Sequence, residues 1–178
     1  FKEGEAKSLT NLGAMESIAG NYSAALQYYF EGLKIWEQIN NKRGMMMNKN
    51  NIGEVYGYLR KNQLQYQYLT EALHIANENK FGDGEALIKN NLSIYYSSKN
   101  DFKNAFATQI DAVLLFEQQN KRSEAALGYS NAGAYKFLSG NLDSALFYYF
   151  KAKAIGEKLN DPRVLSMCYG NIAEVYEN

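Results

Sequence analysis

The sequence predicts an all-α protein built from repeated pairs of antiparallel helices. Three observations support this fold class: a tripeptide that begins with asparagine recurs at a fixed interval, apolar residues within each interval follow helical spacing, and Pro162 is the only proline among 178 residues. Because proline interrupts helices and marks the turns of loop-rich β proteins, its scarcity favours long continuous helices. We therefore expect an α-solenoid of about nine helices, formed by a single array over residues 1–178.

The asparagine tripeptide sets the length of the repeat. It begins at positions 11, 51, 91, 131 and 171, each 40 residues after the last. The copies read Asn11-Leu12-Gly13, Asn51-Ile52-Gly53, Asn91-Leu92-Ser93, Asn131-Ala132-Gly133 and Asn171-Ile172-Ala173. We expect repeats at approximately 1–40, 41–80, 81–120 and 121–160, with the first helix of a fifth repeat at 161–178.

Each period reads as two helices. In the fourth repeat, apolar residues step by threes and fours along one helical face: Leu142, Ala145, Leu146, Tyr149, Ala152 and Ile155. Turn signals such as Gly20-Asn21 and Gly140-Asn141 separate the paired helices. In the second repeat we expect the first helix at about 42–60 and the second at about 63–79.

Small residues occupy fixed columns of the repeat. Gly13, Gly53 and Gly133 stand in first helices, where glycine costs about 1 kcal/mol relative to alanine. Alanines such as Ala25 and Ala145 hold an equivalent column in the second helices. We expect these columns to mark the places where paired helices approach closely.

These residues resemble the tetratricopeptide repeat, whose signature includes Leu-Gly-x2-Tyr followed by Ala-x3-Phe. Ile52 to Tyr56 matches the first half, and Ala25 to Tyr29 matches the second half with tyrosine for phenylalanine. The period exceeds the usual 34 residues, so the chain is similar to the long repeats of kinesin light chains, rapsyn-type adaptors and bacterial signalling proteins. The resemblance implies a right-handed tetratricopeptide-type α-solenoid. A period near 40 also suits HEAT or armadillo repeats, but the Leu-Gly-x2-Tyr pattern and the alanine columns favour the tetratricopeptide repeat.

Composition argues against several classes of partner. Lysine plus arginine and aspartate plus glutamate both total 19, so no basic excess exists to neutralise phosphates. We expect no nucleic-acid partner and no membrane partner, since no apolar run approaches the roughly 20 residues of a membrane helix. A lone cysteine, Cys168, fits a cytoplasmic location. The chain begins at Phe1, and we expect it to be a fragment or a processed product.

The inventory of reactive residues predicts no enzyme. His74 is the only histidine and Cys168 the only cysteine, too few for a typical zinc site. The segment Gly82-Asp83-Gly84 lacks the ending of a phosphate-binding loop and reads as a helix–helix turn. We expect no catalytic residue, no metal site and no cofactor.

The asparagine column is the candidate binding site. A buried amide without a partner costs free energy, so a pure core position would not select asparagine. The family resemblance implies that this column faces a concave groove and that its amides hold the backbone of a ligand. The alternative is that each asparagine bonds to a neighbouring helix. The expected peptide-binding residues are Asn11, Asn51, Asn91, Asn131 and Asn171, together with the apolar Met47, Tyr58, Leu87, Leu127 and Phe137.

The preferred function is a scaffold that binds an extended or amphipathic segment of a protein or peptide. The second hypothesis is a regulatory sensor module of a larger signalling protein, attached to a kinase, cyclase or transcription regulator and responding to a peptide or small ligand. Because the fifth first helix carries Ile172, Val175 and Tyr176 with no second helix after it, weak self-association through this open C-terminal repeat is also expected. Binding of acidic C-termini is not expected, since only Lys7 is basic among the positions that would flank the asparagines.

Overall fold

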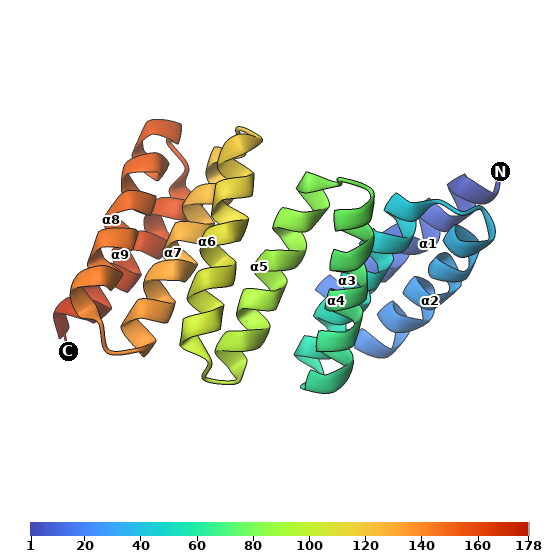
Figure 1. Ribbon diagram of the computed structural model, residues 1–178, viewed down its shortest axis with the longest axis horizontal. Coiled ribbons are helices and arrows are strands. Elements are labelled where there is room, and N and C mark those ends of the chain that lie inside the picture. The colour runs from blue at the N-terminus through green and yellow to red at the C-terminus, as the bar shows by residue number, and fades with distance from the viewer. Residues whose placement is uncertain (178) are drawn as a thin grey trace. The chain divides into compact units, whose positions relative to one another are not determined.

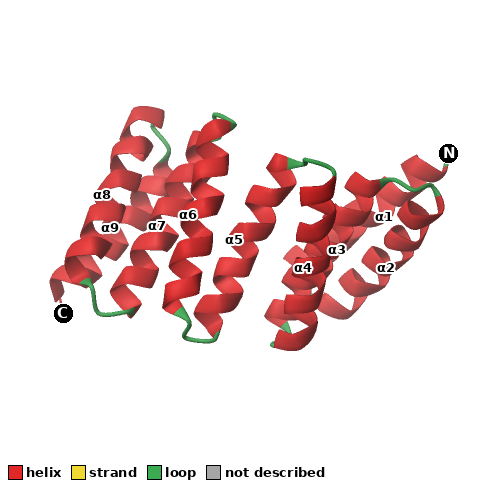
Figure 2. Cartoon of the chain, viewed as in Figure 1, coloured by secondary structure: helices red, strands yellow, loops and turns green. Residues whose placement is uncertain are grey.

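The computed structural model describes residues 1–177, and within them the chain forms nine helices and no strand (Figures 1 and 2). The helices are α1 (Lys2–Ile18), α2 (Tyr22–Gln38), α3 (Lys42–Tyr58), α4 (Asn62–Glu78), α5 (Gly82–Ser98), α6 (Phe102–Gln118), α7 (Arg122–Leu138), α8 (Leu142–Leu159) and α9 (Pro162–Glu177). The predicted all-α fold of helix pairs is therefore confirmed. The two helices predicted for the second repeat are found within two residues of their expected ends.

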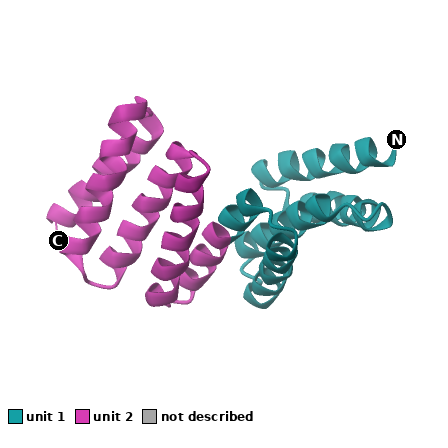
Figure 3. Cartoon of the chain, turned by 45° about the horizontal axis from the view of Figure 1, so that its top comes forward, with its two compact units in different colours: residues 1–88 teal, residues 89–178 magenta. Residues whose placement is uncertain are grey.

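The helices group into two compact units, residues 1–88 and residues 89–178, with the division inside α5 (Figure 3). In the first unit α1 packs against α2, α3 packs against α4, and α2 contacts α3. In the second unit α7 packs against α8, while α6 contacts α7 and α8 contacts α9. Each unit thus repeats the same antiparallel pairing. The single array over residues 1–178 stays a prediction.

Regular turns produce the spacing of the helices. The residue at each multiple of 20 adopts a positive φ, at Gly20 and Gly140 and at six residues that are not glycine: Asn40, Arg60, Lys80, Asn100, Asn120 and Asn160. The backbone N–H of the residue that follows donates a hydrogen bond to a carbonyl in the last turn of the helix. Asn21 N, for example, donates to Glu16 O at 2.8 Å. This left-handed ending satisfies carbonyls that the helix itself leaves unpaired. Most helices have 17 residues, so a three-residue turn after each gives the period.

The small-residue columns lie where paired helices meet, as expected. A Cβ added to Gly13 would lie 2.7 Å from the ring of Tyr29, and one added to Gly53 would lie 2.9 Å from Leu69. Ala25 is completely buried, in a core cluster that also contains Tyr29. The glycines therefore remove a side chain where a large residue of the second helix packs against the backbone.

The third repeat replaces this contact with a polar one. Ser93 stands in the glycine column, and its hydroxyl donates to Gln109 Oε1 at 2.6 Å. The same hydroxyl lies 3.1 Å from the Tyr135 hydroxyl, and Gln109 Nε2 donates to Asn90 Oδ1 at 3.2 Å. Ser93 and Gln109 are both fully buried. The hydrogen bonds with each other, with Tyr135 and with Asn90 offset the cost of removing Ser93 and Gln109 from water.

Candidate functional site: a seam between two first helices

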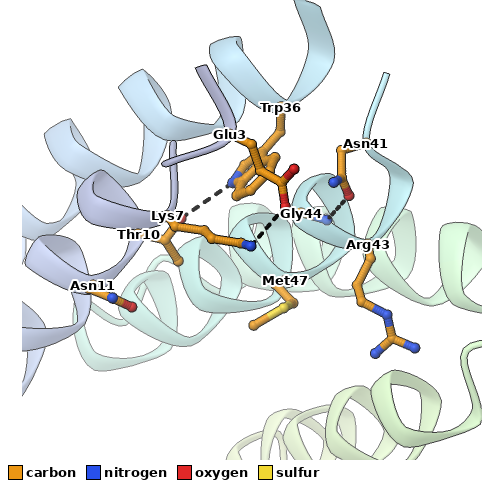
Figure 4. A pocket seen from close by; sticks show the side chains of 9 residues that line it. All are labelled: Glu3, Lys7, Thr10, Asn11, Trp36, Asn41, Arg43, Gly44 and Met47. Carbon is orange, nitrogen blue, oxygen red and sulfur yellow. Dashed lines mark hydrogen bonds and ion pairs between the residues drawn. The ribbon is translucent and has the colours of Figure 1, made fainter. Parts of the chain in front are cut away.

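Two hollows lie along the seam between α1 and α3, on the first helices of the first two repeats. The first hollow has a volume of about 340 Å³ (Figure 4). Residues of α1, α2 and α3 and the turn before α3 line it: Glu3, Lys7, Thr10, Asn11, Trp36, Asn41, Arg43, Gly44 and Met47. The second hollow, of about 270 Å³, continues toward the C-terminal ends of the same two helices. It is lined by Ala14, Ser17, Ile18, Tyr29, Asn51, Glu54 and Tyr58.

The Trp36 ring forms a fixed wall of the first hollow. It packs directly over Gly44, where no side chain larger than hydrogen would fit. The indole N–H donates to Thr10 Oγ1 at 3.3 Å, and Thr10 in turn donates to the Ala6 carbonyl at 2.8 Å. The buried Asn48 donates to Thr10 Oγ1 at 3.2 Å. These bonds hold the indole in place, so the hollow is preformed.

The charged residues at the rim of the first hollow are already paired. Lys7 Nζ lies 2.7 Å from Glu3 Oε1, and a hydrogen bond from Lys7 holds the pKa of the Glu3 carboxyl below its usual range. Arg43 donates to Asp83 at 2.6 Å and lies over the ring of Phe81, 4.5 Å from its centroid. The Arg43 hydrogen bond likewise lowers the pKa of Asp83. Both cations of the rim, Lys7 and Arg43, therefore already have an acidic partner within the chain.

Two tyrosines, Tyr29 and Tyr58, line the second hollow. Tyr58 stacks on Tyr22 with ring centroids 5.3 Å apart, and its hydroxyl donates to Glu54 at 3.0 Å. Burial, helped by the negative charge of Glu54, raises the pKa of Tyr29 to about 12. Tyr29 therefore remains a neutral phenol at any physiological pH. The hollow offers aromatic surface with a single carboxylate at its edge.

The structure brings four of the ten predicted residues to these hollows. Asn11 and Met47 line the first, while Asn51 and Tyr58 line the second. Met47 is 48% exposed and Tyr58 55% exposed, which is high for large apolar side chains. Both are available for contact with another molecule. Sequence reasoning did not identify Trp36, although it is the only tryptophan of the chain.

The other predicted residues lie elsewhere. Asn171 donates to Ser130 Oγ at 3.0 Å, so at this position the asparagine bridges two first helices of the fold, as in the alternative stated above. Asn91 also has a partner. Leu87 is 48% exposed on α5. Asn131 and Leu127 are half-buried on α7. Phe137 packs against the core cluster of Ala145, Tyr149 and Val175.

The single reactive residues do not form a catalytic arrangement with each other. His74 is exposed, with Glu78 3.3 Å away. Cys168 is fully buried, and that burial raises the pKa of its thiol, which disfavours the thiolate. Over residues 1–177, no cluster of three or more histidine, cysteine or acidic residues is placed to hold a metal. In the same range, no helix is both long enough and apolar enough to cross a membrane.

Comparison with known proteins identifies the repeat. Residues 6–43 match the family model described as tetratricopeptide repeat. Comparison with curated proteins finds no sequence match.

Solved structures match over nearly the whole chain. The crystal structure of BtubC (BKLC) from P. vanneervenii has a TM-score of 0.88 at 20% identity, covering 99% of this chain and 73% of that one. A Rap protein complexed with competence and sporulation factor gives 0.79 at 18% identity, covering 97% of this chain and 52% of that one. The nearly identical TPR-like repeats of a putative kinesin light chain from Podosopora anserina give 0.80 at 11% identity, covering 98% of this chain and 87% of that one.

The repeat columns, the helix pairs and these matches together define a tetratricopeptide-type repeat protein. At this level of identity the solved structures establish the fold, and the chain spans about half the length of the Rap protein it matches.

Proposed function

We propose that the protein is a binding scaffold that holds a segment of another protein or a peptide along the seam between α1 and α3. The observation that supports it most is the alignment of two preformed hollows on this seam, each containing one asparagine and one exposed apolar residue of the predicted site. Such concave sites, mostly apolar with a few polar groups, are typical of ligand-binding surfaces.

The asparagines would hold the main chain of the ligand. A carboxamide offers both donors and an acceptor, so Asn11 and Asn51 can pair with peptide groups regardless of the ligand's side chains. A neutral hydrogen bond contributes only about 1 kcal/mol net. Most of the affinity would therefore come from apolar ligand side chains that enter the hollows beside Met47 and Tyr58.

The dimensions of the seam set the size of the ligand. Met47 and Tyr58 are separated by about three helical turns of α3, which corresponds to roughly 16 Å at about 1.5 Å per residue. An extended peptide advances about 3.3 Å per residue, so about five residues span both hollows. The ligand should carry two apolar side chains about five positions apart and little net charge, because the rim cations are already paired.

Selection from a random peptide library tests the proposal. Peptides of about 12 residues are long enough to span the seam at ~3.3 Å per residue. We expect selected peptides to share two spaced apolar residues and to lose at least about tenfold in affinity on Met47→Lys. The matched control is Phe147→Lys, because Phe147 is also apolar and 62% exposed but lies on α8. Peptides that bind the Met47→Lys variant unchanged would contradict the proposal.

A second candidate function is the regulatory sensor module. One matched structure is a Rap protein in complex with competence and sporulation factor, and this chain corresponds to about half of that protein. A segment bound on the seam would then control an attached kinase, cyclase or transcription regulator. The full gene sequence tests this candidate directly, since a sensor module requires an effector domain in the same polypeptide.

A further inference from the structure

Glu54 differs from Glu3, the other acidic residue that lines the two hollows, because it has no basic partner. Glu54 is half-buried on α3 and lines the second hollow. The Tyr58 hydroxyl donates to Glu54 Oε1 at 3.0 Å, and among residues 1–177 no lysine or arginine forms an ion pair with this carboxylate. Glu3, by contrast, is paired with Lys7.

Helix packing gives no reason for a carboxylate at this position. In the first, third and fourth repeats the same column holds Ala14, Ile94 and Ala134, and glutamate returns in the fifth repeat as Glu174. Withdrawing part of a carboxylate from water without a cation costs free energy. A positively charged group from a ligand would offset this cost at Glu54.

The charge of Glu54 is directed at the aromatic surface of the hollow. Together with burial, which is the larger cause, it raises the pKa of both Tyr29 and Tyr58. The Tyr58 ring stacks on Tyr22 and is nevertheless 55% exposed. Aromatic faces attract cations. A cation in this hollow would therefore contact a carboxylate and an accessible ring at the same time.

Elsewhere in the chain, lysines occupy this kind of environment. In two groups a lysine forms an ion pair with a glutamate and also lies over a tyrosine ring, 5.6 Å and 5.4 Å from the ring centroid. The groups are Lys49 with Glu71 and Tyr68, and Lys153 with Glu157 and Tyr169. The chain itself thus combines an ammonium group with a tyrosine ring and a glutamate.

A third group has the same tyrosine–glutamate hydrogen bond as the second hollow. The Tyr129 hydroxyl donates to Glu117 Oε1 at 2.8 Å, just as the Tyr58 hydroxyl donates to Glu54. Lys151 Nζ donates to the Tyr129 hydroxyl oxygen at 2.6 Å and lies 4.0 Å from the ring centroid. Tyr58 and Glu54 therefore form the pair that accommodates a lysine at Tyr129, but their own pair lines a hollow.

We propose that the second hollow binds a primary ammonium group of the ligand, with the Glu54 carboxylate as its ion-pair partner and the Tyr58 ring beside it. This inference rests on the proposed function, because the same ligand occupies both hollows of the seam. The ammonium is the free amino terminus of the ligand or the side chain of a lysine next to the apolar residue that enters this hollow. It adds one positive charge to the two apolar side chains. An ammonium fits better than a guanidinium because the tyrosine–glutamate groups of the chain hold lysines, whereas Arg43 lies over Phe81.

Two modifications of the bound peptide distinguish the two sources of the ammonium. The probes are synthetic 12-residue peptides selected from the random library. Acetylation removes the ammonium of the amino terminus, and replacement of lysine by norleucine removes the ammonium of the side chain while keeping its apolar stem. One of these changes should lower the affinity by at least about tenfold, because the lost contact is a charge-assisted hydrogen bond. If neither change lowers it, the proposal is wrong.

The Glu54→Gln variant tests the partner of the ammonium. Glutamine keeps the size of the side chain and can still accept the Tyr58 hydrogen bond, but it carries no charge. The variant should bind the unmodified peptide at least about tenfold more weakly and should bind the peptide that lacks the ammonium as tightly as the unchanged protein does, because the two charges act as a pair. Glu31→Gln is the matched control, since it removes the same charge from an exposed position on α2 outside both hollows.

The outcomes separate this inference from the function on which it rests. Peptides that lose affinity on Met47→Lys but bind the Glu54→Gln variant as tightly as the unchanged protein contradict the inference alone. Peptides that bind both variants without loss contradict binding on the seam, and the inference with it. An equal loss of affinity in Glu31→Gln would reflect the net charge of the protein and would also overturn the role of Glu54.

Discussion

The ring of Tyr149 lies against the backbone of Gly133, so that a Cβ on residue 133 would be 2.6 Å from ring atom Cε1 and 3.1 Å from the Ala145 carbonyl oxygen. Tyr149 is 2% exposed and belongs to the core cluster at the end of the second unit. Close packing at this point depends on the absence of a side chain on α7.

Gly133→Ala should therefore destabilise the fold by about 1–3 kcal/mol, the usual cost of overpacking a core, despite the better helix propensity of alanine. Gly170→Ala is the control, because nothing lies within 4 Å of a Cβ at that helical position. It should stabilise by up to about 1 kcal/mol. Urea unfolding of the two variants measures both effects. Equal effects of the two substitutions would show that Tyr149 moves aside freely.

Breaking the polar pair of the third repeat should also be costly. Ser93→Ala removes the hydroxyl that donates to Gln109 and leaves a buried amide oxygen without this partner. We expect a loss of about 1–3 kcal/mol in the free energy of unfolding, the penalty of an unsatisfied buried group. The double variant Ser93→Gly, Gln109→Leu reproduces the Gly53 and Leu69 pair. It should be more stable than Gln109→Leu alone; if it is not, the two positions do not act as a pair.

Ionisation of Tyr149 should weaken the fold at alkaline pH. Burial, with the nearby charge of Glu174, raises the pKa of Tyr149 to about 12, whereas an unperturbed tyrosine has a pKa of 10.0. The neutral phenol is favoured in the folded state, so this contribution to stability is complete below pH 10 and is lost as pH rises through about 12. Since a shift of one pKa unit corresponds to about 1.4 kcal/mol, the loss can reach about 2–3 kcal/mol.

Urea unfolding at about pH 7 and about pH 11 tests this expectation, because the interval brackets the pKa of a free phenol. Tyr149→Phe should lose less stability between the two conditions than the unchanged protein does. Tyr176→Phe, at a position 70% exposed, is the control and should behave like the unchanged protein. An identical alkaline loss in all three proteins would mean that Tyr149 ionises without strain.

The repeat allowed most of the fold to be predicted from sequence, because its columns have local physical causes. Glycine and asparagine at turn positions, such as Gly20 and Asn40, support the left-handed endings that set the helix spacing. The glycine column likewise predicted that the paired helices approach each other closely at Gly13, where the Tyr29 ring packs against the backbone. Arg60 and Lys80 adopt this conformation without a sequence signal for it, since the fixed register of the packed helices imposes it.

The candidate site was less predictable, because its shape depends on side chains from different helices. The hollow beside Met47 requires the indole of Trp36 to be held by Thr10, 26 residues away in sequence. The sequence showed a serine in the glycine column, but not that Gln109 would be its partner. Five identical asparagines also acquire different surroundings: Asn11 lines a hollow, whereas Asn171 bonds to Ser130.

Acidic C-terminal peptides should not bind to the seam. Lys7 and Arg43 are the basic residues of the first hollow, and they are paired with Glu3 and Asp83. Recruiting either cation to a free carboxylate would break an existing ion pair and gain little. Titration with a peptide that ends in acidic residues, compared with its C-terminal amide, should show no saturable difference. Micromolar binding that disappears on amidation would contradict the prediction.

The central claim is that Asn11 and Asn51 bind a ligand, and one comparison within the asparagine column tests it most directly. The double variant Asn11→Ala, Asn51→Ala should lower the affinity for library-selected peptides by at least about tenfold, with little change in melting temperature, because two lost hydrogen bonds contribute about 1 kcal/mol each. Asn171→Ala should do the opposite, lowering the melting temperature through the lost Ser130 contact while leaving peptide affinity unchanged. If the double variant instead loses stability and keeps its affinity, the asparagines on the seam are structural and the scaffold does not bind its ligand there.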